Sequence, residues 1–132
     1  MRTVCEILKE SKNIAVYGMS DKPARISRDI ALFLKRKGYN VAGVNPMVKS
    51  DEVDGIKIYR SLKDVPFKID IVDVFRRSEN IPEIIPDVLE IKPQVLWLQS
   101  GIINDEAVKP AIEAGIETIQ DTCIMVEYNH CR

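Results

Sequence analysis

The chain has 132 residues, of which 45% are hydrophobic, a composition that supports one compact domain over residues 1–132 without a second domain. Its 19 basic and 20 acidic residues leave a formal net charge of −1, so no global field attracts nucleic acid or anionic lipid. We therefore expect no nucleic-acid partner. Any phosphate recognition must come from locally placed groups, which favours a small-molecule ligand over a polyanion.

No apolar stretch approaches the roughly 20 residues that span a bilayer, and the first residues contain no apolar secretory core. We therefore expect no membrane contact and a cytoplasmic location. The three cysteines, Cys5, Cys123 and Cys131, form no Cys-x-x-Cys pair, so we expect reduced thiols and neither a disulfide framework nor a zinc site. For His130 and Cys131 we expect a mobile terminus, because a metal site there needs ligands from elsewhere.

The first third of the chain predicts a helix, a buried strand and a second helix. Thr3 can cap a helix that ends near Ser11, and an apolar run then forms a strand that ends at Tyr17. Gly18 opens the loop that follows. The second helix ends in basic residues before a left-handed cap at Gly38. Its apolar stripe, which should face the sheet, consists of Ile26, Ile30, Phe33 and Leu34.

The rest of the chain alternates between short apolar runs and helical patterns. We expect strands at 41–44, 69–75, 95–98 and 117–120, and a short strand segment at 55–59 after a polar loop. A helical turn is expected at 61–64, a helix capped by Asn104 before Gly115, and a terminal segment that can be helical through Tyr128. Ser78 or Asn80 can cap the remaining helix. Because Pro86 would break an established helix, we expect an irregular start and regular helix mainly after Ile85.

This alternation predicts an α/β fold, namely a doubly wound, Rossmann-like parallel sheet of about five strands with helices on both faces. In an open parallel sheet the ligand crevice lies outside the carboxyl ends of the strands. The segments that follow the strands should converge at that edge. They are expected to begin at Gly18, Asn45, Phe75, Gln99 and Asp121.

The loop after the first strand predicts an anion site. Gly18 lets the chain turn sharply where a side chain would obstruct a ligand. Amides at the following helix start, with Ser20, Arg25, Ser27 and Arg28 nearby, can hold phosphate oxygens through the helix dipole and charge-assisted hydrogen bonds. The alternative is structural, because the serines can cap the helix and the arginines can be solvated. Of the two arginines, Arg25 is the better phosphate candidate.

Four motifs in order carry a family resemblance. They are Gly-Met-Ser-Asp-Lys-Pro-Ala-Arg-Ile-Ser at 18–27, Gly-Tyr-Asn-Val-Ala-Gly-Val-Asn-Pro at 38–46, Asp-Ile-Val-Asp-Val-Phe-Arg at 70–76 and Trp-Leu-Gln-Ser-Gly-Ile-Ile-Asn-Asp-Glu-Ala at 97–107. Over nearly its whole length the chain resembles the small, stand-alone CoA-binding proteins. The resemblance implies a Rossmann-like CoA-binding domain related to that of succinyl-CoA synthetase alpha subunits.

The resemblance also implies roles for particular residues toward coenzyme A or an acyl-CoA. The glycine loop would bind the phosphates, and the end of the second strand would contact the adenosine side of the ligand. The end of the third strand would form the next wall of the binding site. The predicted cofactor-binding residues are Gly18, Met19, Ser20, Lys22, Arg25, Ser27, Asn45, Pro46, Phe75, Arg76, Gln99 and Gly101.

The chain departs from its relatives in two ways. Where they commonly have Asp-Arg-Cys near the last strand, this chain has Thr122 before Cys123, so one cation is missing. The larger synthetases use a phosphohistidine, whereas the single histidine here, His130, is near the terminus. We therefore predict no catalytic residue. Cys123 allows one sharper hypothesis, a mixed disulfide with the CoA thiol, beside the simpler interpretation of an inert buried thiol.

Two alternative functions depend on different residues. An NADP-dependent oxidoreductase could use Arg25 and Arg28 for the extra phosphate, but Gly-x-Gly-x-x-Gly and an acid at the end of the second strand are absent. A phospho-accepting receiver domain could use Asp73, but its paired acids and its lysine are missing. We instead expect Asp70 and Asp73 to bond loop amides and Trp97 to pack in the core. A homodimer or an acyl-transfer partner protein is compatible with the sequence.

Overall fold

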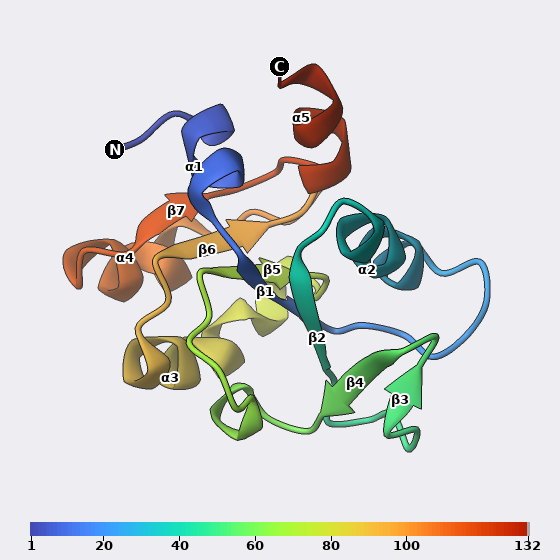
Figure 1. Cartoon of the computed structure of the whole chain (residues 1–132). Helices are drawn as coiled ribbons and strands as arrows, with labels where there is room; N and C mark the ends of the chain where they lie inside the picture. The colour runs from blue at the N-terminus through green and yellow to red at the C-terminus, as the bar shows by residue number, and fades with distance from the viewer. Residues whose placement is uncertain (132) are drawn as a thin grey trace.

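A computed structural model describes residues 1–131 of the chain (Figure 1). The described residues form five helices around one seven-stranded sheet. The helices are α1 (Val4–Glu10), α2 (Ile26–Arg36), α3 (Ile81–Ile91), α4 (Asp105–Glu113) and α5 (Ile124–His130). The strands are β1 (Asn13–Tyr17), β2 (Asn40–Val44), β3 (Glu52–Val53), β4 (Ile56–Tyr59), β5 (Ile71–Val74), β6 (Val95–Leu98) and β7 (Glu117–Ile119). Short 3-10 turns lie at Leu62–Asp64 and Ser78–Asn80. No helix in the described part is both long enough and apolar enough to cross a bilayer.

The strand order is β3-β4-β2-β1-β5-β6-β7. All neighbours pair in parallel except β3, which pairs antiparallel with β4 at the edge. Without β3, this is the Rossmann order, in which the chain starts in the middle, winds outward to one side and then returns to wind to the other. The predicted fold class is confirmed. The predicted count of about five strands is too low, because the expected segment at 55–59 is a full strand and the polar loop before it contributes β3.

The sheet divides the core into two layers. Alternate residues on β5 face opposite sides, so Val72 and Val74 pack under α3 and α4, while Ile71 packs under α1, α2 and α5 (Figure 1). Trp97 on β6 is fully buried and donates through Nε1 to the Thr122 carbonyl at 2.8 Å, so the packing role expected for it is confirmed. Because both faces are covered, the ligand-accessible parts of the sheet are its ends.

Helix boundaries follow the predicted caps. The Thr3 hydroxyl accepts from Glu6 N–H at 3.1 Å, and the Glu6 carboxylate accepts from Thr3 N–H at 2.8 Å, which forms a capping box at the start of α1. The Asn104 side chain accepts from Ala107 N–H at 3.0 Å at the start of α4. Gly38 follows α2 with φ +99°, the left-handed conformation expected of a helix cap.

The expectation for α3 is wrong. A 3-10 turn at 78–80 leads directly into a helix that begins at Ile81, and Pro86 lies inside it. Pro82 and Pro86 are both exposed, four residues apart on the solvent face. The bond that Pro86 cannot donate would go to the carbonyl of Pro82, which water can reach, while Ile81 and Ile85 remain packed in the core. Burial of the apolar face therefore outweighs the local cost of the proline.

The expectation of reduced thiols is also wrong, because Cys5 on α1 and Cys131 after α5 form a disulfide. The two residues are 126 positions apart, so no local spacing could indicate the pair. The same bond overturns the expected mobile terminus, since His130 belongs to α5 and Cys131 is tied to α1. Cys123 is the free cysteine of the described chain.

Candidate functional site

The loops after β1 and β5 meet at the point where the strand order reverses. Gly18 has φ +89° and donates its amide to the Val44 carbonyl at 2.6 Å, while Phe75 N–H donates to the Tyr17 carbonyl at 2.8 Å. A Cβ on Gly18 would lie well inside 3.0 Å of the Phe75 carbonyl oxygen, closer than real Cβ atoms come. Gly18 therefore makes the sharp turn that the sequence predicts, and its lack of a Cβ also allows a close approach to the Phe75 backbone.

A short hydrogen-bonded loop connects Gly18 to α2. The Ser27 hydroxyl accepts from Ser20 N–H at 3.0 Å, and the Ser20 hydroxyl accepts from Lys22 N–H at 3.0 Å. Ala24 has φ +65°, so the chain takes a strained turn immediately before Arg25. These bonds bring Ser20 and Ser27 together and leave Lys22 and Arg25 exposed.

The start of α2 has no side-chain cap. Arg25 occupies the N-cap position without bonding the first turn, and the N–H groups of Ile26, Ser27 and Arg28 have no acceptor within residues 1–131. Three free donors at the positive end of a helix dipole attract an anion. The Arg28 side chain is engaged elsewhere, since it pairs with Asp54 at 2.6 Å. Arg25, in contrast, is exposed at the N-cap position and makes no side-chain cap bond.

The end of β2 lies beside this loop. The Asn45 side chain donates to the Met19 carbonyl at 3.0 Å and accepts from Met47 N–H at 2.9 Å, which fixes the turn at Pro46. Met19 is fully buried, and its side chain packs against Gly43. Pro46 and Met47 are exposed. A ligand can reach Pro46, whereas Met19 as a whole is buried.

An open groove of about 860 Å³ continues from the start of α2 across the ends of β5 and β6. Four predicted residues line it, namely Phe75, Arg76, Gln99 and Gly101. The Gly101 amide donates to the Asp121 carboxylate at 2.6 Å, which draws the segment after β7 toward the groove. Arg76 forms a 3.7 Å ion pair with the more exposed Glu83. The segments after β5, β6 and β7 thus meet at this groove, whereas Gly18 and Asn45 are not among its lining residues.

Gln99 is the most enclosed polar residue of the groove, with 4% of its surface exposed. Its Oε1 accepts from Ile124 N–H at 3.1 Å. This bond fixes the orientation of the side-chain amide, because only the oxygen can accept it and Nε2 is a donor. No described residue accepts from Nε2. In the described chain, the Asp73 carboxylate oxygens are the only side-chain polar atoms that are both fully enclosed and unpaired. The unpaired Nε2 of Gln99 is therefore not fully enclosed, and Gln99 lines the groove.

Asp70, which precedes β5, and Asp73, which lies on β5, differ in their hydrogen bonding. The carboxylate of Asp70 accepts from Lys12 and Asn13 N–H, each at 2.9 Å, as predicted. Asp73 was expected to do the same, but it is fully buried between β1 and β6 and neither of its oxygens has a partner. Burial raises the pKa of Asp73 well above 3.8, because the charged form loses its hydration there.

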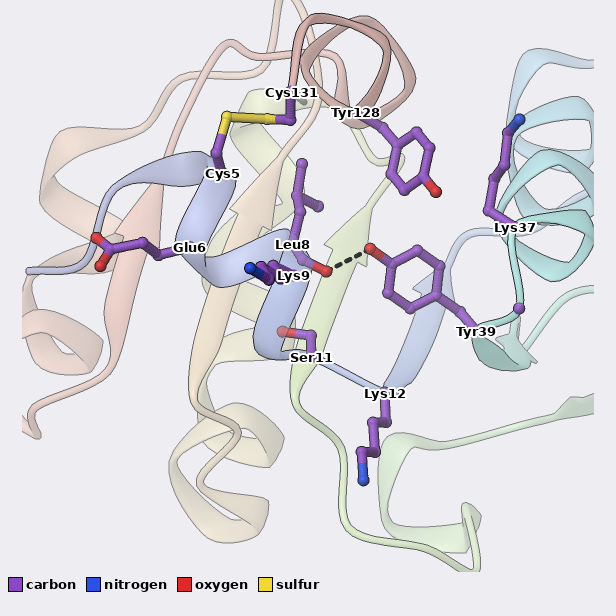
Figure 2. A pocket seen from close by; sticks show the side chains of 11 residues that line it. Cys5, Glu6, Leu8, Lys9, Ser11, Lys12, Lys37, Tyr39, Tyr128 and Cys131 are labelled. Carbon is purple, nitrogen blue, oxygen red and sulfur yellow. Dashed lines mark hydrogen bonds between the residues drawn. A yellow bond between two sulfur atoms is a disulfide. The ribbon is translucent and has the colours of Figure 1, made fainter.

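A second pocket, of about 620 Å³, lies near the amino ends of β1 and β2, where helices α1, α2 and α5 end (Figure 2). Figure 2 shows the ring of Tyr128 above that of Tyr39, in edge-to-face contact, with the disulfide to the upper left. The Tyr39 hydroxyl donates to the Leu8 carbonyl, and burial raises the pKa of Tyr39 to about 12. No predicted cofactor residue lines this pocket. Its lysines, including Lys37, complement the carbonyl ends of the helices.

The sequence did not identify the apolar residues Ile26, Ile102 and Val126, which line the groove. Cys123, for which the sequence suggests a mixed disulfide with the CoA thiol, also lines it. Ile26 was expected on the core stripe of α2, but it is 57% exposed because the first residue of α2 projects beyond the end of the sheet. The position of Ile26 immediately after the glycine loop could have indicated a place beside the ligand. Its helical periodicity instead assigned it to the apolar stripe that faces the core.

Fold and site together define a class of protein. The chain is a Rossmann-like α/β domain in which an uncapped helix start, a glycine turn and a groove meet at the switch point of the sheet.

Comparison with known proteins gives the family. A model described as "CoA binding domain" matches residues 12–129, so the chain belongs to the CoA-binding domain family. It is 43% identical over 123 residues to the uncharacterized protein YneT of Bacillus subtilis, covering 93% of this chain and 90% of that one. The solved structure of cell-free ID.343 from Thermus thermophilus has a TM-score of 0.92 and 36% identity, with 98% of each chain covered.

A larger relative links the domain to an enzyme subunit. The chain is 34% identical over 61 residues to the alpha subunit of an ADP-forming acetate–CoA ligase from Pyrococcus furiosus. The match covers 46% of this chain and 13% of the ligase subunit. The predicted resemblance to CoA-binding proteins is confirmed at the level of the family.

Proposed function

We propose that this chain binds coenzyme A or an acyl-CoA, with the diphosphate on the glycine turn and the start of α2. The observation that carries the proposal is the set of three unpaired amides at the first turn of α2, beside the Ser20 hydroxyl and the exposed Arg25. Membership of the CoA-binding domain family names the ligand class. The amides supply fixed donors and Arg25 supplies charge, which is what a diphosphate requires.

The remaining parts of the ligand follow from the neighbouring elements. The adenosine side would lie over Asn45 and Pro46 at the end of β2, and the pantetheine arm would enter the groove past Phe75 and Arg76. Gln99 and Gly101 would border that arm. Thr122 adds no charge here, and its hydroxyl already donates to the Gln120 carbonyl at 2.8 Å. Phosphate recognition would therefore depend on the α2 side of the site.

We further propose that the domain is a binding module without catalysis of its own. No described residue of the groove forms a nucleophile–base pair, and the single histidine, His130, lies at the far end of α5. Asp73 is enclosed without a partner and is not among the residues of the groove. A cytoplasmic role in storing CoA or delivering it to a partner protein fits such a module, and either a monomer or a homodimer could fulfil it.

The test is a thermal-shift titration with CoA, dephospho-CoA, NAD and NADP side by side. A ligand at about 100 times its dissociation constant stabilises the fold by roughly 2.7 kcal/mol, which is readily detected in a domain of this size. CoA should stabilise and NAD should not. Stabilisation by NADP without a response to CoA would favour the oxidoreductase alternative, and no response to CoA at millimolar concentration would refute the proposal.

A further inference from the structure

The apolar rim of the groove is built from two helices that start at the same edge of the sheet. Ile26 is the first residue of α2 and is 57% exposed, and Val126 is in the first turn of α5 and is 45% exposed. The two helices pack side by side, with Phe33 and Tyr128 in edge-to-face contact at 5.6 Å. Both exposed side chains line the groove, together with the half-buried Phe75 and Ile102.

This rim needs an apolar occupant. Large hydrophobic side chains exposed singly need no explanation, but two of them line one groove together with an aromatic ring. Arg77 and Ser78 also line the groove. The lining thus includes both apolar and polar side chains.

A buried side-chain amide also lines the same groove. The Gln99 side chain is 4% exposed, and its oxygen is held by Ile124 N–H at 3.1 Å, which leaves Nε2 as an unpaired donor. An enclosed amide with one arm fixed is a preorganised donor for a carbonyl oxygen. Free CoA ends in a thiol, which is a poor acceptor, whereas a thioester presents a carbonyl at that end.

We propose that the groove recognises the acyl end of an acyl-CoA, with Gln99 Nε2 donating to the thioester carbonyl and Ile26 and Val126 covering a short aliphatic chain. This inference rests on the proposed function, because it takes the phosphates to lie at the start of α2. It narrows the ligand from CoA in general to short-chain aliphatic thioesters.

The first experiment is calorimetric titration of the full chain with CoA, acetyl-CoA, butanoyl-CoA and hexanoyl-CoA. Each methylene buried on the rim should tighten binding by about fourfold until the groove is filled. Ile26→Ser and Val126→Ser should each flatten this dependence on chain length. Ile112→Ser, an equally exposed isoleucine on α4 that does not line the groove, is the matched control and should leave the dependence intact.

The second experiment isolates the carbonyl. Wild-type protein should bind butanoyl-CoA about two- to tenfold more tightly than the S-butyl thioether of CoA, which has the same chain length but lacks the acceptor. In Gln99→Met that preference should disappear, which distinguishes a lost donor from a general loss of fold.

The possible outcomes separate this inference from the proposed function. Absence of binding for every ligand would refute the proposed function itself. Binding of CoA with no gain from longer chains and no preference for thioester over thioether would refute the acyl site alone. A gain with chain length that persists in both serine variants would also overturn it, because the chain would then lie elsewhere.

Discussion

The Cys5–Cys131 disulfide should raise the free energy of unfolding by several kilocalories per mole. It joins residues 126 positions apart, and the loop-entropy relation gives about 5 kcal/mol for constraining an unfolded chain of that length. The bond also holds together α1 and α5, which have seven residues each and are too short to be stable as isolated helices. We therefore expect reduction to lower the free energy of unfolding by roughly 2–5 kcal/mol.

Urea denaturation followed by the fluorescence of Trp97 measures this loss. Trp97 is the only tryptophan and is fully buried, so its emission reports unfolding of the core. Thiol titration under denaturing conditions should find one free thiol before reduction and three after it. Cys5→Ser should match the reduced wild type and should not respond further to reductant, whereas Cys123→Ser should respond fully. Equal stability of the oxidised and reduced wild type would refute the reasoning.

Three further predictions concern the carboxyl edge of the sheet. Gly18→Ala should cost at least about 1–2 kcal/mol in urea denaturation, because alanine disfavours φ +89° and its Cβ would collide with the Phe75 carbonyl; an unchanged midpoint contradicts this. Arg25→Ala should weaken CoA binding by about 1.5–3 kcal/mol in calorimetry, while Arg36→Ala, exposed at the other end of α2, should not; equal effects would remove Arg25 from the site. Since burial raises the pKa of Asp73 above 3.8, wild-type stability should fall as pH rises from about 4 through the folded-state pKa, by at most about 1.36 kcal/mol per unit. Denaturation of Asp73→Asn over the same pH range should lack that decline, and parallel profiles would contradict the assignment.

The features predicted correctly from sequence are those with local causes. The strand before Gly18, the caps at Thr3 and Asn104, and the helix ends at Gly38 and Gly115 each depend on a few adjacent residues. The meeting of loops at one edge followed from the parallel order of the strands, because all such strands end on the same side. Local chemistry and topology thus sufficed to locate the candidate site.

The features that were missed depend on residues far apart in the sequence. The disulfide joins the two ends of the chain, and α3 tolerates Pro86 because its other face packs in the core. The unpaired state of Asp73 is a property of three strands at once, since its neighbours across the sheet are Val16 and Trp97. No periodicity in a single segment contains that information.

The terminal helix α5 connects the disulfide with the groove at the carboxyl edge of the sheet. Its last turn is tied to α1 through Cys131, and its first turn lines the groove through Val126 and donates the Ile124 N–H to Gln99 Oε1. A helix of seven residues gains most of its stability from such contacts rather than from its own backbone. The wall of the groove therefore depends on a bond formed at the opposite end of the sheet. For this reason, acyl-chain titrations on this protein require a defined redox state.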